Sequence, residues 1–352
     1  MSQTVIFTND VADALNRLVV QGGYHSVAVL TDEHTRQLVL PLLRPCEALR
    51  RATHITIAAG ESHKTLESLT QVWTALQQSG ATRQSLLVNL GGGLVTDLGG
   101  LAASTFKRGI PFVNVPTTVL GAVDAAVGGK TGIDFGGLKN EIGTFCPANA
   151  VIVSACFFDT LPREEVMAGY AEMVKHAMLQ SVDELNRVLD TDFGHCTPEH
   201  MLELVEASVQ VKRRIVAEDP TEQGLRRSLN LGHTVGHAIE SFALERGKPV
   251  RHGYAVAWGL VVESVLSHLR QGFPSEVLYR LARFVRENYG AFHITCDDYD
   301  RLLQLMRHDK KSRHGEINCT LLRQCGDAAL DVTVSDDDMK AAIDIYRDLM
   351  GI

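Results

Sequence analysis

The sequence predicts an α/β protein of two domains, with a largely parallel sheet in the first domain and helices in the second. Its 352 residues exceed the length at which a single hydrophobic core usually stops growing. In the first half, short β-branched runs alternate with helical patterns, as in parallel sheets with helical connections. These runs are HSVAVLTD, THITIAAG, SLLVNLGGG, FVNVPTT and AVIVSA. Ligands are expected at the carboxyl ends of such strands.

Helical periodicity replaces the β-branched runs from Pro162 onward, as in EHMLELVEASVQVKRRIVAE and GHTVGHAIESFAL. Proline suits the first turn of a helix, so a helix is expected to begin there. We therefore expect an α/β domain over residues 1–161 and an all-helical domain over residues 162–352.

Composition favours a folded protein that acts on small molecules. The chain is 45% hydrophobic and 22% charged, and its net charge is −8 without a long Lys/Arg run, so no nucleic-acid partner is expected. The apolar stretch from Ala255 to Val265 is interrupted by Glu263 and is too short to span a membrane. The N-terminus lacks a secretory signal, and the seven cysteines form no Cys-x-x-Cys pair. These features predict a cytoplasmic protein with reduced thiols.

A glycine turn, Gly91-Gly92-Gly93, follows the apolar run at 85–90 and precedes a helix-compatible segment. Glycines let backbone N–H groups approach a phosphate, and a helix N-terminus favours negative charge. The turn therefore indicates a nucleotide site. Its spacing is not G-x-G-x-x-G, however, and a purely structural turn is an equal alternative.

A second glycine element, Val127 to Thr131, places Lys130 between glycine and threonine. It is similar to the end of a P-loop, but Asp124 stands where that motif requires its first glycine, so ATP is not expected. Lys130, together with Lys139 and Asn140, suits a phosphate or an oxyanion. The alternative is a solvated loop.

Two helical segments carry potential metal ligands. Glu172 and Lys175 share a helix face at i,i+3, which is also the spacing of an ordinary intrahelical ion pair. His233 and His237 are spaced at i,i+4, which can chelate a metal. Thr234 stands where the metalloprotease motif H-E-x-x-H has its catalytic glutamate, so a metalloprotease is not expected.

His252 begins another apolar helix, and Arg226 and Asn230 precede the histidine pair. One carboxylate with two or three imidazoles can hold zinc or another divalent ion while leaving a coordination position for substrate. An open position indicates catalysis rather than a structural metal.

Taken in order, the motifs resemble the 3-dehydroquinate synthase family from about Gly60 to Lys311. They are GESHK, GGGLVTDLGG, FKRG, VPTT, VDAAVGGKTG, LKN, AEMVKH, GLRRSLNLGHTVGHAIE, RHG and DKK. The resemblance implies a Rossmann-like nucleotide-binding domain followed by an all-helical metal-binding domain, in a homodimer. It also implies conversion of a phosphorylated sugar acid, 3-deoxy-D-arabino-heptulosonate 7-phosphate, into 3-dehydroquinate and phosphate in the shikimate pathway. NAD would oxidise the substrate transiently, phosphate would leave, and re-reduction and aldol closure would follow.

The resemblance further implies roles for single residues. A divalent metal, zinc or cobalt, would be held by Glu172, His233 and His252, so that His237 contacts substrate instead. The positions implied to contact NAD are Glu61, Lys64, Gly93, Asp97, Thr117, Thr118, Lys130, Lys139 and Thr160.

Substrate contacts are implied at three groups of residues. The phosphate would meet Lys130, Asn140, His237 and Lys310, with Arg108 reaching across a dimer contact. The carboxylate would meet Lys212, Arg226 and Asn230, and Asp124 and Lys175 would orient hydroxyls. The choice between Lys310 and Lys311 stays open, and the loop at 134–138 differs from the proline-containing version of many members.

Three alternatives remain. Other sugar phosphate cyclases close substrates without a carboxylate, and the presence of Arg226, Asn230 and His237 favours the acid substrate. An iron-type alcohol or glycerol dehydrogenase would need no phosphate site and would release NADH. An inactive binding protein would be expected to have lost part of this set of residues.

Overall fold

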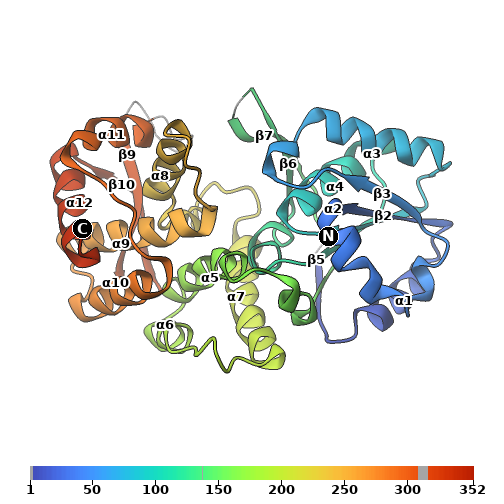
Figure 1. Cartoon of the computed structure of the whole chain (residues 1–352), viewed down its shortest axis with the longest axis horizontal. Helices are drawn as coiled ribbons and strands as arrows, with labels where there is room; N and C mark the ends of the chain where they lie inside the picture. Colours follow the sequence, from blue (N-terminus) through green and yellow to red (C-terminus); the bar gives the residue numbers. More distant parts are fainter. Residues whose placement is uncertain (1–2, 137, 308–315) are drawn as a thin grey trace. The chain divides into compact units, whose positions relative to one another are not determined.

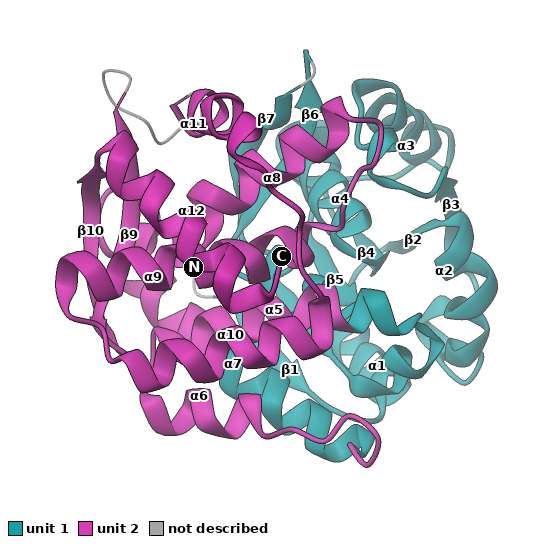
Figure 2. Cartoon of the chain, turned by 60° about the vertical axis from the view of Figure 1, so that its left-hand side comes forward, with its two compact units in different colours: residues 1–166, 197–209 teal, residues 167–196, 210–352 magenta. Residues whose placement is uncertain are grey.

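The structure is a computed structural model that describes residues 3–136, 138–307 and 316–352. The chain divides into two compact units, which Figure 2 colours separately. Unit 1 comprises Met1–Val166 with Thr197–Val209, and unit 2 comprises Met167–Cys196 with Gln210–Ile352.

Unit 1 is built on a parallel sheet (Figure 1). Among the described residues its strand order is β1-β8-β5-β4-β2-β3. The strands are β1 (Thr4–Phe7), β2 (Ser26–Asp32), β3 (Thr53–Ile57), β4 (Ser85–Gly91), β5 (Phe112–Pro116) and β8 (Ala150–Val153). The predicted β-branched runs form all of these except β1, whose short run carries too little pattern to stand out. Every residue of β4 is buried, as expected for a strand covered on both faces.

Helices connect these strands, and local side chains start most of them. They are α1 (Val11–Gly22), α2 (Glu33–Leu38), α3 (Leu66–Gln78) and α4 (Gly93–Thr105). Asp10, Asp32 and Thr65 each accept a first-turn N–H of the helix that follows. The N-cap of α4 is Gly92, which has no side chain to play this part. Short segments add 3₁₀ turns at Leu40–Leu43, Glu47–Leu49, Glu61–His63, Phe106–Arg108 and Ala155–Thr160, and a π turn at Gly121–Ala125.

The glycine element around Lys130 and the segment around Lys139 form an antiparallel hairpin. Its strands are β6 (Lys130–Phe135) and β7 (Leu138–Phe145), with Lys130 opposite Phe145. The ladder is irregular between Ile133 and Phe135. Strand β6 lies against α4, and Ser104 Oγ lies 3.0 Å from Thr144 Oγ1.

Unit 2 is mainly helical. Its helices are α5 (Arg163–Met178), α6 (Val182–Leu189), α7 (Pro198–Glu218), α8 (His233–Glu245), α9 (His252–Gln271), α10 (Ser275–Tyr289), α11 (Tyr299–Arg307) and α12 (Asp336–Met350), of which α5 and α7 begin in unit 1. The 3₁₀ turns are Leu225–Asn230 and Cys296–Asp298. Most of α9 is buried, including Glu263.

One feature of unit 2 corrects the expectation of helices alone. Strands β9 (Ile317–Gln324) and β10 (Asp327–Val334) form an antiparallel hairpin. Between them lies Gly326, whose φ of +85° suits a tight turn. The sequence did not predict this hairpin, because β10 is mostly half-exposed and its residues show no regular apolar alternation. No helix in the described part of the chain combines the length and the apolar character needed to cross a membrane.

Candidate active site

Unit 1 gathers the predicted nucleotide residues at the carboxyl ends of β3, β4 and β5. From β2 the chain continues to β3 on one side, and from β4 it continues to β5 on the other, so the strand order switches direction between β2 and β4. Such switch points are where parallel sheets bind ligands. The Thr117 N–H donates to the Gly91 carbonyl at 3.0 Å. A Cβ at Gly92 would lie 3.1 Å from Thr118, so glycine permits the close approach of these two turns.

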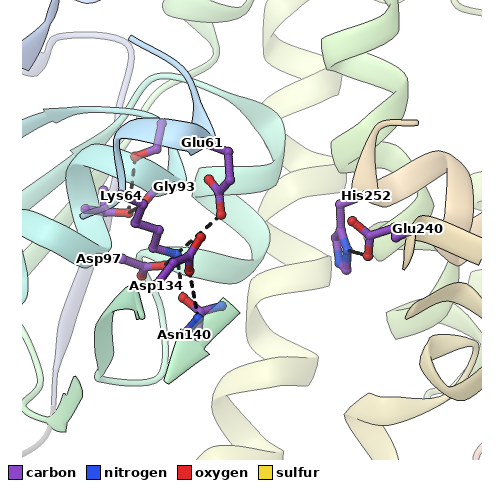
Figure 3. A network of polar contacts seen from close by, with 10 residues as sticks. Glu61, Lys64, Gly93, Asp97, Asp134, Asn140, Glu240 and His252 are labelled. Atoms are coloured by element: carbon purple, nitrogen blue, oxygen red, sulfur yellow. Dashed lines mark hydrogen bonds and ion pairs between the residues drawn. The ribbon is translucent and has the colours of Figure 1, made fainter. Parts of the chain in front are cut away.

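Lys64 is the centre of a polar cluster in this region (Figure 3). Its side chain is buried, and its Nζ donates to Asp97 Oδ2 at 2.6 Å and to Asn140 Oδ1 at 2.6 Å. Glu61 Oε1 lies 3.8 Å from the same ammonium. The cluster thus joins the turn after β3, helix α4 and the β6–β7 hairpin.

Charges explain the protonation of this cluster. Burial disfavours the ammonium, but the carboxylates of Asp97 and Glu61 outweigh that effect and raise the pKa of Lys64. Burial also raises the pKa of Asp97 to about 6, although Lys64 opposes the change. Lys64 is therefore a fixed positive charge at neutral pH, and Asp97 is a carboxylate held in an unfavourable environment.

Asn140 has a left-handed backbone, with a φ of +51°. Its N–H donates to Asp134 Oδ1 at 2.7 Å, and the Asp134 N–H in turn donates to the Lys64 carbonyl at 2.8 Å. Asn tolerates this conformation better than most residues. The irregular part of the hairpin therefore aims the Asn140 side chain at Lys64 (Figure 3).

The other predicted residues of unit 1 lie after β5, after β8, in the π turn or at exposed positions. Thr117 is buried, and Thr118 Oγ1 accepts the Gly121 N–H at 2.9 Å. Thr160 Oγ1 donates to the Phe157 carbonyl at 2.7 Å. The remaining ones are Asp124 in the π turn, exposed Lys130 and Lys139 on the hairpin, and exposed Arg108, whose φ is +65°.

Unit 2 brings Glu172, His233 and His252 together. Their potential ligand atoms all lie within 4.8 Å of one another. Glu172 Oε1 lies 3.4 Å from Nε2 of each histidine, and Glu172 is fully buried. Its other oxygen, Oε2, forms an ion pair with Lys175, which is also buried. One carboxylate and two imidazole nitrogens that converge in this way suit a divalent metal.

Both histidines are oriented through their second ring nitrogen. His233 Nδ1 lies 3.1 Å from the Leu231 carbonyl, and His252 Nδ1 lies 2.9 Å from Glu240 Oε2 (Figure 3). Burial disfavours the imidazolium of His252, but Glu172 and Glu240 outweigh it and raise the pKa of His252 to about 10. Two carboxylates around one imidazole make this a site that attracts positive charge.

Among the predicted substrate residues of unit 2, Arg226 and Lys212 are buried, whereas Asn230 and His237 are half-buried. Arg226 donates from Nη1 to the Pro220 carbonyl at 2.7 Å. Asn230 donates to Glu222 Oε1 at 3.4 Å, and the ring of His237 lies 5.3 Å from that of His233, centroid to centroid. Lys212 is buried on α7. Lys310 and Lys311 lie outside the described residues.

Sequence reasoning missed Asp134, Glu240 and Glu263. Glu240 had a signal, because it stands at i+7 from His233 and so on the same helix face. Glu263 stood out as a charge inside an apolar run, but its partners are set by the crossing of two helices. Asp134 had no such signal, because its partner is set by the hairpin.

The sequence was compared with models of known protein families. The family model for the N-terminal part of 3-dehydroquinate synthase matches residues 54–168, and the model for the C-terminal part matches residues 169–312. A 3-dehydroquinate synthase of Parabacteroides distasonis is 44% identical over 350 residues, which cover 99% of both chains.

Solved structures agree with this fold. A 2-epi-5-epi-valiolone synthase from Streptomyces hygroscopicus, with NAD+ and Zn2+ bound, has a TM-score of 0.84 and 27% identity, covering 99% of this chain and 97% of that one. A 2-deoxy-scyllo-inosose synthase complexed with carbaglucose-6-phosphate, NAD+ and Co2+ has a TM-score of 0.81 and 22% identity, covering 96% and 95%, and shows likeness of fold alone. From its match to both family models and its full-length relative, the chain belongs to the 3-dehydroquinate synthase family.

Proposed function

We propose that the chain is a phosphate-eliminating carbon–oxygen lyase that converts 3-deoxy-D-arabino-heptulosonate 7-phosphate into 3-dehydroquinate and phosphate. This reaction belongs to the shikimate pathway, which supplies aromatic amino acids. The observation that carries the proposal is the convergence of two imidazoles on one buried carboxylate, with Glu172 Oε1 lying 3.4 Å from Nε2 of both His233 and His252. Family membership supplies the reaction that such a centre serves.

The metal in this proposal is zinc or cobalt, held by Glu172, His233 and His252. A carboxylate and two imidazoles suit either ion and leave positions for substrate oxygens. Bound there, the ion would supply Lewis acidity to a substrate oxygen. The Lys175 ammonium beside Glu172 would hold a proton near the same place and, with Asp124, orient the substrate hydroxyls.

The nucleotide is NAD, bound by residues of unit 1, and it would supply reversible oxidation of the substrate. Lys64 offers a buried cation and Gly93 the start of α4, which suits an anionic pyrophosphate. The residues proposed to contact NAD are Glu61, Lys64, Gly93, Asp97, Thr117, Thr118, Lys130, Lys139 and Thr160. We further propose that the nucleotide domain covers 1–161 and the metal domain 162–352.

The substrate would be held at both charged ends. Arg226 is buried, and its planar guanidinium can bind a carboxylate through two parallel hydrogen bonds, with Lys212 and Asn230 as further contacts. Cations and donors are required around a leaving phosphate, and those proposed are Lys130, Asn140, His237 and Lys310. No single protein base is assigned, because the departing phosphate can itself accept a proton.

The chain is proposed to act as a cytoplasmic homodimer, with Arg108 serving the partner subunit's site. Arg108 is exposed and has a φ of +65°, a conformation that is costly for a residue other than glycine. The hairpin strand β7 is exposed, and large apolar side chains project from the hairpin, namely Phe135, Leu138, Ile142 and Phe145. All seven cysteines are free thiols, which suits a reducing compartment.

The experiment is an assay of phosphate release from the seven-carbon sugar acid phosphate. Purified protein would receive catalytic NAD and zinc or cobalt, while absorbance reports NADH. Phosphate and dehydroquinate should appear without net NADH. Release only from sugar phosphates without a carboxylate would indicate a different cyclase, and steady NADH formation from simple alcohols would indicate a dehydrogenase.

Two controls test the metal and the dimer. A chelator should abolish phosphate release and added metal should restore it, and His233→Ala should lose bound metal by elemental analysis. Mixing Arg108→Ala and His233→Ala chains should restore partial activity if one subunit completes the other's site. Activity in metal-free protein would refute the proposed metal role.

A further inference from the structure

Glu240 links the two helices that carry the histidines of the metal cluster. It lies on α8 at i+7 from His233, and its Oε2 lies 2.9 Å from Nδ1 of His252 on α9. The Glu240 side chain is only 12% exposed. A carboxylate held this far from water is costly unless it has a strong partner, and His252 is such a partner.

The two rings of the cluster have the same orientation with respect to Glu172. In each of His233 and His252, Nε2 lies 3.4 Å from Glu172 Oε1, and Nδ1 faces an acceptor. The acceptor is the Leu231 carbonyl for His233 and the Glu240 carboxylate for His252. In both cases the nitrogen that faces away from Glu172 is occupied, so Nε2 is the nitrogen left for a metal.

We infer that Glu240 is a positioning residue of the metal centre. Its carboxylate accepts a hydrogen bond from the Nδ1–H of His252, which fixes the tautomer in which Nε2 carries the lone pair, and it holds the ring with Nε2 toward Glu172. A carboxylate partner also makes the imidazole a stronger donor than a carbonyl partner does. The inference rests on the proposed function, because it assumes that Glu172, His233 and His252 bind a metal.

A direct ligand role for Glu240 is the competing arrangement. Potential ligand atoms of His237, Glu240 and His252 also lie within 4.8 Å of one another. The observed contact favours positioning, because 2.9 Å between Nδ1 and Oε2 is an ordinary hydrogen-bond distance. Nε2 of His233 and Nε2 of His252 both lie beside the same oxygen of Glu172, and Glu172 is more deeply buried than Glu240. These contacts favour Glu172, not Glu240, as the carboxylate ligand.

The test measures affinity for zinc and for cobalt by competition with a chelator, in three variants and the wild-type protein. Glu240→Ala should bind each metal about 10- to 100-fold more weakly. Glu240→Gln should bind with intermediate affinity, because the amide oxygen can still accept a hydrogen bond from the Nδ1–H. Glu245→Gln is the matched control on the same helix, since Glu245 is exposed and pairs with Arg301. It should bind like the wild type.

The visible spectrum of bound cobalt separates positioning from ligation. At saturating cobalt, Glu240→Gln should keep the wild-type band positions and intensity, because the same three ligands remain. Unchanged metal affinity in Glu240→Ala would overturn the inference, and a changed cobalt spectrum in Glu240→Gln would replace it with direct ligation. If the wild-type protein itself bound no metal, both the proposed function and the inference would fail. If the wild type bound metal and Glu240→Ala bound it equally well, only the inference on Glu240 would fail.

Discussion

Glu263 on α9 accepts the backbone N–H of Gly232 at 2.7 Å, directly before the helix that carries His233. Its second oxygen accepts the Val235 N–H at 3.2 Å. A helix start is normally capped by its own N-cap side chain, but Gly232 has none. Its φ is +78°, and a Cβ there would lie 2.8 Å from Leu260. The fully buried Glu263 therefore replaces the missing cap and fixes α8 against α9.

Replacing Glu263 by Ala should lower the free energy of unfolding by about 2–4 kcal/mol, because it leaves two buried N–H groups without an acceptor. Glu263→Gln should cost less, since one oxygen remains. Urea unfolding followed by circular dichroism measures both. Glu206→Ala, at an exposed position of α7, is the control and should change stability little. Equal stability of Glu263→Ala and the control would contradict the capping role.

The raised pKa of Asp97 predicts a pH effect on stability. The folded state holds a proton on Asp97 up to about pH 6, whereas the usual pKa is 3.8. The unfolding free energy should therefore fall as pH rises from about 4 to about 6, by up to about 3 kcal/mol from this group. Asp97→Asn removes this contribution, so the variant should gain stability relative to the wild type across that window. Its NAD affinity should fall.

Urea unfolding at pH 4.5 and pH 7 checks the prediction. Asp300→Asn is the matched control, because the Asp300 side chain is 92% exposed. An Asp97→Asn variant with the same pH dependence as the wild type would show that burial of Asp97 carries no energetic cost.

Asp134 should act on the reaction through Asn140. Asp134→Ala removes the acceptor of the Asn140 N–H, and the loss of one such bond should lower kcat/KM for phosphate release about 2- to 10-fold. In an Asn140→Ala background the same change should have little further effect, because the side chain it positions is gone. Fully additive losses in the double variant would argue for two independent roles.

Arg226→Lys should chiefly weaken binding of the carboxylated substrate. A lysine keeps the charge but lacks the planar fork, so KM should rise about 10-fold or more. Arg227→Lys is the neighbouring control, because Arg227 forms an ion pair with Asp331. Steady-state kinetics with purified variants give KM and kcat separately. Unchanged values for Arg226→Lys would exclude a contact between Arg226 and the substrate carboxylate.

The sequence by itself determined those strands, helices and turns that can be predicted from the residues of one short segment. The runs that become β2, β4, β5 and β8 are largely apolar, because strands inside a parallel sheet are covered on both faces. Strand β3 lies at the edge of the sheet, and its run alternates polar residues with buried Ile55 and Ile57. The sequence also predicted that His233 and His237 share a helix face and that a helix begins after the glycines that precede α4. The motif order from Gly60 to Lys311 was specific enough to indicate the family.

Only the tertiary structure decided which of these residues meet. Lys64 contacts Asp97 and Asn140 because the order of the strands and the β6–β7 hairpin bring three distant segments together. Glu240 and Glu263 meet His252 and Gly232 across the crossing of α8 and α9. Periodicity reports which face of an element is buried, but it contains no information on the partner of that face. Contacts between elements depend on how whole surfaces fit, and that is fixed only when the chain is folded.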